Sequence, residues 1–171
     1  MDQVGGTYRE SFAHASRAIV ESFQIPDHRI LAFYEYWDSK ISDNRPPLRS
    51  NIDPIEIPQF LTGIVLYEVM EGGDRFRFKL WGTLLTQIYG YDCTGKFADE
   101  VFEDSRSADI HRVLRGVAET QQPHYWEIDT PVENRTFMKY RRIALPLWTN
   151  ADRVELLIGF HTALPRQISL G

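Results

Sequence analysis

The spacing of apolar residues along the chain changes near residue 63, and this change divides the sequence into two parts. Upstream, apolar residues recur every three or four positions, which is the period of a helix with one apolar face. The pattern predicts helices over 8–23 and 30–41, with Asp27 as the N-cap of the second helix. Residues 46–58 contain four prolines, so we expect a tether there instead of long regular structure.

Downstream of residue 63, apolar and polar residues alternate in several segments, as in strands with one buried face. In the clearest of these segments, Phe76, Phe78 and Leu80 are predicted to face the core and the intervening basic residues to face solvent. A helix with one apolar stripe is predicted from Ser105 to about residue 121. The expected strands are 63–70, 75–80, 124–129, 137–148 and 153–162.

This element order predicts an α+β fold in which a five-stranded antiparallel sheet carries helices on one face. We therefore expect three parts: an N-terminal helical extension with its tether over 1–62, a single domain over 63–164, and a tail over 165–171. The apolar faces of the two N-terminal helices must be covered, either by the sheet of their own chain or by a two-fold dimer interface.

Composition narrows the classes of partner. The formal net charge of −5 gives no positive field for nucleic acid or for anionic lipid. The single cysteine, Cys93, excludes an internal disulfide, and the N-terminus lacks the apolar core of a signal peptide. No segment has the roughly 20 apolar residues that span a bilayer. We expect a soluble, cytoplasmic protein that binds neither nucleic acid nor membrane.

Three glycine-containing segments in the middle of the chain resemble PAS domains. They are Leu80-Trp81-Gly82-Thr83, Ile88-Tyr89-Gly90-Tyr91-Asp92 and Thr94-Gly95-Lys96. Glycines here let short helices turn sharply against the sheet. Upstream, Tyr36-Trp37-Asp38, Ile52-Asp53-Pro54, Ile57-Pro58 and Leu61 resemble the lead-in of a subfamily of short stand-alone PAS proteins common in alphaproteobacteria. The resemblance implies signal perception or protein interaction, usually with a small-molecule pocket between sheet and helices.

Several residues have a functional alternative that we weigh against an ordinary structural one. Cys93 lies near the flavin-bonding cysteine of light-sensing PAS relatives, but Asp92 replaces their asparagine, so we interpret Cys93 as a half-buried core residue. His111 lies in the region that supplies the axial histidine of haem-binding PAS domains, but it falls off the apolar stripe and is expected at the rim. Gly72-Gly73-Asp74 resembles part of a diguanylate cyclase signature and is interpreted as a tight turn.

The sequence gives little support for a metal site or a catalytic site. The histidines have no metal-ligand spacing and no catalytic motif is present, so we predict no metal, no cofactor and no catalytic residue. Arg141 and Arg142 lie on opposite faces of one strand, so one of them is predicted to point inward, where a ligand anion or a carboxylate would be needed.

We expect a cavity suited to an apolar or aromatic ligand, unless the same residues simply fill the core. The predicted ligand-binding residues are Leu66, Phe78, Leu80, Ile88, Tyr89, Val113, Leu114, Val117, Tyr140, Arg142 and Phe160. The sequence thus predicts a non-enzymatic PAS-type signalling or interaction domain that acts through a signalling partner or as a homodimer built from the N-terminal helices. The alternatives are a sensor that carries haem or flavin and a small α+β cone-type enzyme.

Overall fold

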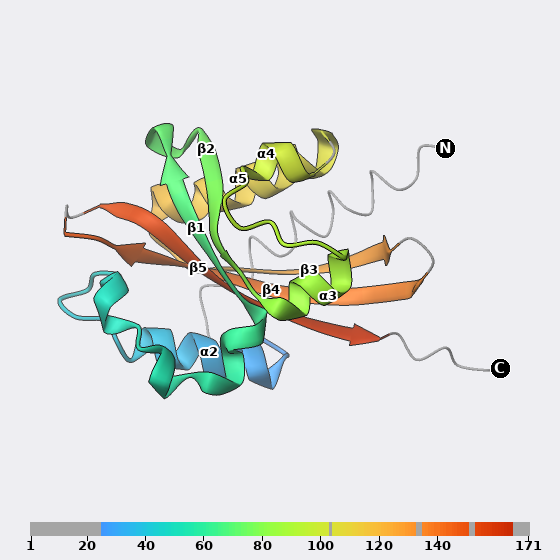
Figure 1. The fold of residues 1–171 in the computed structure, drawn as a ribbon. Helices are drawn as coiled ribbons and strands as arrows, with labels where there is room; N and C mark the ends of the chain where they lie inside the picture. The colour runs from blue at the N-terminus through green and yellow to red at the C-terminus, as the bar shows by residue number, and fades with distance from the viewer. Residues whose placement is uncertain (1–24, 103, 133–134, 151–152, 166–171) are drawn as a thin grey trace.

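A five-stranded antiparallel sheet forms the centre of the molecule, with the strand order β2-β1-β5-β4-β3 (Figure 1). The structure is a computed structural model that describes residues 25–102, 104–132, 135–150 and 153–165. The strands are β1 (Ile64–Met70), β2 (Arg75–Trp81), β3 (His124–Val132), β4 (Arg135–Trp148) and β5 (Val154–Pro165). The predicted α+β class and all five predicted strands are therefore confirmed. The helix predicted over 8–23 lies outside the described residues.

The helices fall into two groups, one upstream of the sheet and one inserted between β2 and β3. The α-helices are α2 (His28–Asp38), α3 (Thr83–Tyr89), α4 (Ala98–Val101) and α5 (Asp104–Thr120). The proline-containing tether folds into the short 3-10 helices η2 (Arg49–Asn51), η3 (Pro54–Glu56) and η4 (Pro58–Gly63), and η5 (Glu71–Gly73) forms the β1–β2 turn. The short helical segments after β2 and the one longer helix match the sequence prediction.

Both faces of the sheet are buried, each by a different group of helices. In β1, Val65 and Tyr67 pack into a cluster with α3, α4 and α5, which we call the helix-side core. Ile64 and Leu66 pack on the opposite face with α2, with η4 and with the two isoleucines that flank η3, Ile52 and Ile57, in a cluster that we call the α2-side core. Figure 1 shows α5 and α2 on opposite sides of the strands. The helices expected on one face are present, and α2 adds a second layer.

A bulge in β2 changes which residues face the helix-side core. Leu66 pairs with Leu80, but the next residue of β1, Tyr67, pairs with Phe78, so the register shifts by one residue. Phe78 stays 1% exposed, Leu80 becomes 41% exposed and Trp81 takes the next buried position. The predicted burial of Leu80 is wrong because the extra residue reverses the alternation beyond Phe78.

Asp27 fixes the start of α2 and also ties this helix to the sheet. Its Oδ1 accepts hydrogen bonds from the backbone N–H groups of Arg29 (2.9 Å) and Ile30 (3.2 Å), which confirms the predicted N-cap. Its Oδ2 accepts a hydrogen bond from Thr162 Oγ1 at 3.1 Å and lies 3.5 Å from an Arg141 guanidinium nitrogen. The carboxylate is only 6% exposed, so these four partners replace its lost solvent.

The apolar face of α2 packs against the sheet of its own chain. Phe33 is 1% exposed, and its ring centroid lies 5.3 Å from that of Phe60 and 5.1 Å from that of Phe160. The Trp37 indole Nε1 donates a hydrogen bond to the carbonyl oxygen of Pro146 at 3.0 Å. Of the two ways to cover this helix that the sequence left open, α2 adopts the intramolecular one.

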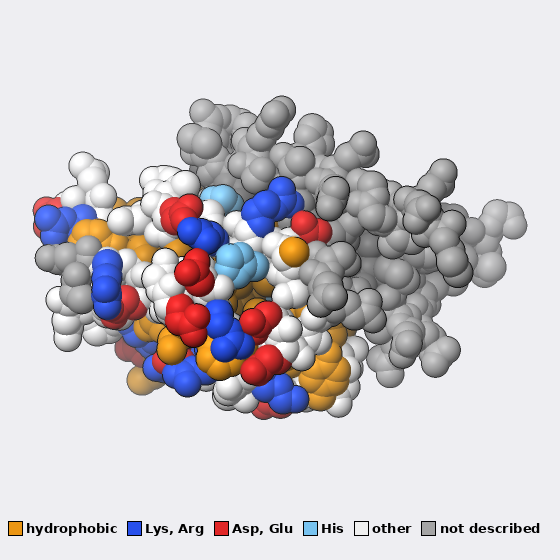
Figure 2. Space-filling view, turned by 90° about the horizontal axis from the view of Figure 1, so that it is seen from above, with side chains coloured by type: hydrophobic (Ala, Val, Ile, Leu, Met, Phe, Trp, Pro, Cys, Tyr) orange, Lys and Arg blue, Asp and Glu red, His pale blue; other side chains and the backbone are white. Residues whose placement is uncertain are grey.

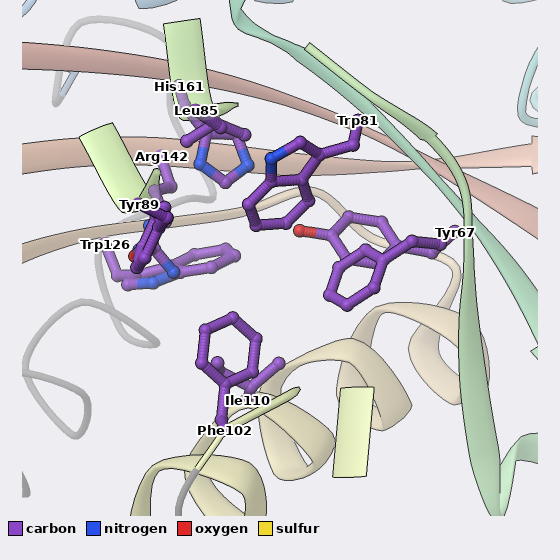
Figure 3. A pocket seen from close by; sticks show the side chains of 10 residues that line it. Tyr67, Trp81, Leu85, Tyr89, Phe102, Ile110, Trp126, Arg142 and His161 are labelled. Carbon is purple, nitrogen blue, oxygen red and sulfur yellow. The ribbon is translucent and has the colours of Figure 1, made fainter. Parts of the chain in front are cut away.

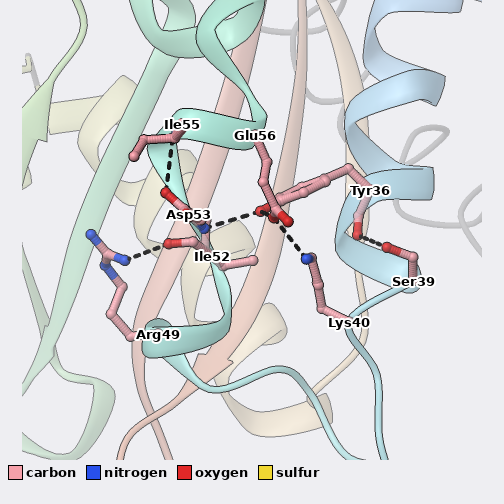
Figure 4. Close-up of polar contacts among 8 residues, drawn as sticks. All are labelled: Tyr36, Ser39, Lys40, Arg49, Ile52, Asp53, Ile55 and Glu56. Carbon is pink, nitrogen blue, oxygen red and sulfur yellow. Dashed lines mark hydrogen bonds and ion pairs between the residues drawn. The ribbon is translucent and has the colours of Figure 1, made fainter.

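A polar network holds the outer side of α2 to the 3-10 segment (Figure 4). The Tyr36 hydroxyl donates to Glu56 Oε2 at 2.7 Å and accepts a hydrogen bond from the backbone N–H of Asp53 at 3.0 Å. Lys40 Nζ lies 2.7 Å from the same Glu56 oxygen. These groups are exposed, so they orient the segment more than they stabilise it.

Two of the glycines that carried the resemblance have specific backbone roles. A Cβ atom at Gly82 would lie 2.3 Å from the carbonyl oxygen of Thr62, which is too close for any side chain. Gly95 has φ of +85°, and its N–H donates to the Phe78 carbonyl at 2.7 Å, while the Phe78 N–H donates to the Lys96 carbonyl at 2.9 Å. Close approach and positive φ both favour glycine, as the sequence indicated.

Replacing Asp27 by alanine removes the cap and leaves Thr162 and Arg141 without their carboxylate. We expect Asp27→Ala to lower the free energy of unfolding by about 2 kcal/mol or more, measured by urea denaturation. Asp53→Ala is the matched control, because Asp53 caps η3 with one exposed hydrogen bond to Ile55. Its loss should be about 0.5 kcal/mol. Equal losses in the two variants would contradict the anchoring role of Asp27.

The Asp27 anchor should also give the fold an acid dependence. Burial raises the pKa of this carboxyl, but the backbone hydrogen bonds from Ile30 and Arg29, the Thr162 hydroxyl and the Arg141 charge outweigh burial, so its pKa lies below the ordinary 3.8. The ionised form therefore stabilises the fold above the unfolded-state pKa, and this contribution disappears as the pH falls through the lowered folded-state value.

Asp27→Asn keeps an acceptor for the cap but does not ionise. The stability advantage of the wild type over this variant, measured by chemical denaturation, should stay constant near neutral pH and shrink below about pH 4. An advantage that does not change down to pH 3 would show that the ionised carboxylate is not responsible.

Candidate functional site

A small cavity in the helix-side core is the candidate functional site (Figure 3). It lies between the sheet and the helices α3 and α5. The residues that line it are Tyr67, Phe78, Trp81, Leu85, Tyr89, Phe102, Ile110, Trp126, Arg142 and His161. Only about 10 Å³ is open to the centre of a water molecule, which is room for about one water.

Aromatic rings make up most of the cavity wall. The Phe78 ring lies 5.4 Å from that of Tyr67 on β1 and 4.9 Å from that of Trp81, measured between centroids. Tyr89, at the end of α3, lies 5.6 Å from Trp81 and 6.2 Å from Phe102. Most of these pairs are tilted or edge-on, as is typical of packed aromatic side chains. The rings fill the space between sheet and helices, which accounts for the small cavity.

Two polar side chains reach this aromatic cavity from the sheet. Arg142 on β4 and His161 on β5 are directly paired across the two strands, and they are 6% and 3% exposed. Arg142 donates a hydrogen bond to the Tyr89 hydroxyl at 3.0 Å, and its guanidinium lies 5.5 Å from the Tyr140 ring centroid. Of the arginine pair in the sequence, Arg142 is the inward one, while Arg141 faces α2.

His161 and Trp81 present buried polar atoms to the cavity. Neither ring nitrogen of His161 has a hydrogen-bond partner among the described residues, and the same holds for Trp81 Nε1. Burial, and then the charge of Arg142, holds the pKa of His161 well below its usual value. The imidazole is therefore neutral, with one nitrogen that donates and one that accepts. Unpaired buried groups of this kind are costly unless a bound molecule or a water satisfies them.

The predicted cavity residues separate into three groups in the structure. Phe78, Tyr89 and Arg142 line the cavity. Five others lie elsewhere in the helix-side core: Ile88, Val113, Leu114, Val117 and Tyr140. The remaining three do not reach this face, since Leu66 and Phe160 belong to the α2-side core and Leu80 is exposed beyond the bulge.

Leu66 and Phe160 are each one position away from a residue that lines the cavity. Leu66 precedes Tyr67, and Phe160 precedes His161, so a shift of one residue puts the side chain on the other face. Sequence reasoning missed His161 because apolar residues occupy both faces of β5. The signal available was the inward arginine on β4, which fixes the face of each residue paired with it in the neighbouring strand.

Neither flavin nor haem fits this cavity, because each needs far more room than one water molecule occupies. Cys93 is fully buried in the helix-side core, and burial raises the pKa of its thiol to about 11. His111 Nε2 lies 2.8 Å from the Asp74 carbonyl oxygen, and its ring packs edge-on against Phe76 of β2. Across the residues that the structure describes, no group of His, Cys, Asp and Glu is placed to hold a metal.

The surface that covers this core is a mixture of acidic and basic side chains (Figure 2). Arg75 pairs with Asp99 at 2.9 Å, and Arg115 pairs with Asp74 at 3.0 Å and with Glu119 at 2.7 Å. None of the described helices has the length and the apolar character that a membrane span requires.

Comparison with known proteins agrees with this architecture. Among solved structures, the PAS domain of Bordetella pertussis BvgS is similar with a TM-score of 0.52 and 15% identity, over 66% of this chain and 84% of that one. A fungal LOV domain photoreceptor is similar with a TM-score of 0.47 and 16% identity, over 79% and 91% of the two chains. No curated protein matches. The family model for the PAS domain matches residues 26–162, which is most of the sequence, and the chain therefore belongs to the PAS domain family.

Proposed function

We propose that this PAS domain is a non-enzymatic signalling module that senses a small ligand in its helix-side cavity and passes the signal on through α2. The observation that carries the proposal is the arrangement of two neighbouring residue pairs on β4 and β5. Arg142 pairs with His161, and Arg141 pairs with Thr162. The first pair faces the cavity and the second faces α2.

Because successive residues of a strand point to opposite faces, these two pairs are joined directly through the backbone. A ligand that draws Arg142 or His161 toward it shifts the strand segment that also positions Arg141 and Thr162. The packed cores on both faces transmit such a shift instead of absorbing it. The sheet itself is thus the link between the cavity and the helix on its other face.

The receiving end of this link is the Asp27 cap. The Asp27 carboxylate is held at once by Thr162 and Arg141, so a change in either one alters both the cap and the docking of α2. This contact joins residues 135 positions apart in the sequence. An N-terminal helix that is held by the sheet in this way is suited to report the state of the cavity to a protein partner.

The cavity also bears on the alternative functions. A cone-type enzyme needs space for a substrate beside its titratable groups, whereas room for about one water lies beside His161 and Arg142. A sensor that carries flavin or haem would likewise need more space than this cavity has. Family membership and the small aromatic cavity together support a sensory role without catalysis.

The proposed link is testable by hydrogen exchange. Arg142→Gln removes the charge and the contact with Tyr89 on the cavity side, and we expect exchange of the α2 backbone amides to accelerate at least about fivefold relative to β1 amides. Arg153→Gln is the control, because it removes the same charge from an exposed pair with Glu155 and should leave α2 unchanged. If Arg142→Gln accelerates exchange of the α2 amides no more than exchange of the β1 amides, the proposed link is wrong.

We further propose that a second copy of the chain is one recipient of the signal. Because the apolar face of α2 is buried by its own sheet, the predicted helix over 8–23, which lies outside the described residues, is assigned to this contact. Sedimentation of the full chain at micromolar concentration should show a dimer, and Phe12→Ser with Ile19→Ser should shift it toward monomer. Ile55→Ser is the control, since this residue is 85% exposed on η3. A wild-type monomer would contradict the proposal.

A further inference from the structure

Two hydrogen-bond donors in the cavity, on Trp81 and His161, indicate what kind of ligand it takes. Both side chains are more than nine-tenths buried, with Trp81 7% and His161 3% exposed. The Trp81 indole nitrogen lies on the side of its ring that faces His161 (Figure 3). An indole N–H only donates, and a neutral imidazole donates from one nitrogen. With their nitrogens lacking hydrogen-bond partners among the described residues, these two groups call for an acceptor between them.

The electrostatics of the cavity favour an anionic acceptor. Arg142 brings a permanent positive charge to the cavity wall, and this charge acts to lower the pKa of both His161 and Tyr67. None of the ten lining residues is an aspartate or glutamate. Charge-assisted hydrogen bonds to an anion are about twice as strong as neutral ones, and the aromatic walls keep competing solvent away.

The size of the cavity limits how large this anion is. Space for about one water molecule admits a halide, or a flat ion of three or four heavy atoms after small movements of the rings. A tetrahedral dianion such as sulfate is too large, and an aromatic ligand would have to displace the rings that form the wall. The apolar or aromatic ligand expected from the sequence therefore matches the apolar walls, but it offers no acceptor to the N–H groups of Trp81 and His161.

We infer that the cavity binds a compact monoanion, of the chloride, nitrate or formate class, through the N–H groups of Trp81 and His161 beside the Arg142 guanidinium. The inference rests on the proposed function, for which it names the chemical class of the input. A single buried water is the competing occupant, and it has to be separated from the anion by experiment.

The chain contains four tryptophans, and their indole N–H signals in a nitrogen-15 spectrum of the full protein provide the assay. Trp37 and Trp148 already donate to Pro146 and Gln121, so they serve as internal references outside the cavity. In a chloride-free buffer, titration with sodium chloride, nitrate or formate should move the Trp81 signal to saturation and leave both references in place. Sodium sulfate at matched ionic strength should not move it.

Comparison of the three monoanions identifies the source of the ligand. Saturation at the lowest concentration by formate indicates a small carboxylate, whereas saturation first by chloride or nitrate indicates an inorganic ion. If none of them moves the Trp81 signal more than sulfate does, the cavity holds only water and the inference is overturned.

Variants test the assigned donors. Trp81→Phe keeps the aromatic wall but removes the N–H, and with the Trp126 indole as the reporter we expect the apparent affinity to fall about tenfold or more. His161→Phe should weaken binding similarly, and it provides a second test if Trp81→Phe does not fold. Trp148→Phe, on the same strand as Arg142 but outside the cavity, should bind as the wild type does. Unchanged affinity in the Trp81 and His161 variants would overturn the inference.

These outcomes are distinct from those that test the proposed function. If α2 responds to Arg142→Gln but no monoanion moves the Trp81 signal, the ligand class is wrong and the link through the sheet stands. If the anion binds and α2 exchange stays unchanged in that variant, the ligand class stands and the link is wrong.

Discussion

Strands β4 and β5 carry buried side chains on both of their faces, and the rest of the structure depends on covering both. Ile143, Leu145 and Phe160 are fully buried on the α2 side, while Ala144 and Leu157 are fully buried on the helix side. A sheet with two apolar faces needs two covering layers. The segment from α2 through η4 is therefore an integral part of the folded domain, which agrees with a family match that begins at residue 26.

The same two-sided burial decides what could be predicted from the sequence. The positions of the strands, of α5 and of the Asp27 cap follow from local periodicity and capping chemistry, and the structure confirms them. Periodicity does not determine which face of the sheet each side chain takes, because neighbouring positions in β1 and β5 are both apolar. The sequence therefore predicts Leu66 in the cavity, whereas Tyr67 lines it in the structure. The β2 bulge, which exposes Leu80, has no local signal either.

The cavity combines an aromatic wall with polar groups that are expensive to bury. Arg142 and His161 lie side by side on adjacent strands, and burial together with the arginine charge keeps the histidine neutral. Replacing such groups with apolar residues often preserves or improves stability. For this reason the role that we propose for them in this otherwise apolar core is recognition of a ligand. On the opposite face, Asp27 places a buried negative charge against the same two strands.

The pairing of Phe78 with Gly95 and Lys96 has a consequence for how the molecule behaves in a crowded solution. β2 is an edge strand, and a free edge invites pairing with a strand of another molecule. The loop occupies the backbone groups of Phe78 on that edge and also bridges Arg77 to Phe97. Because Gly95 has a positive φ, any other residue there would be strained, and this strain would weaken the loop's hold on the edge. By allowing the loop to pair with Phe78, this glycine leaves less of the edge open to pairing with another molecule.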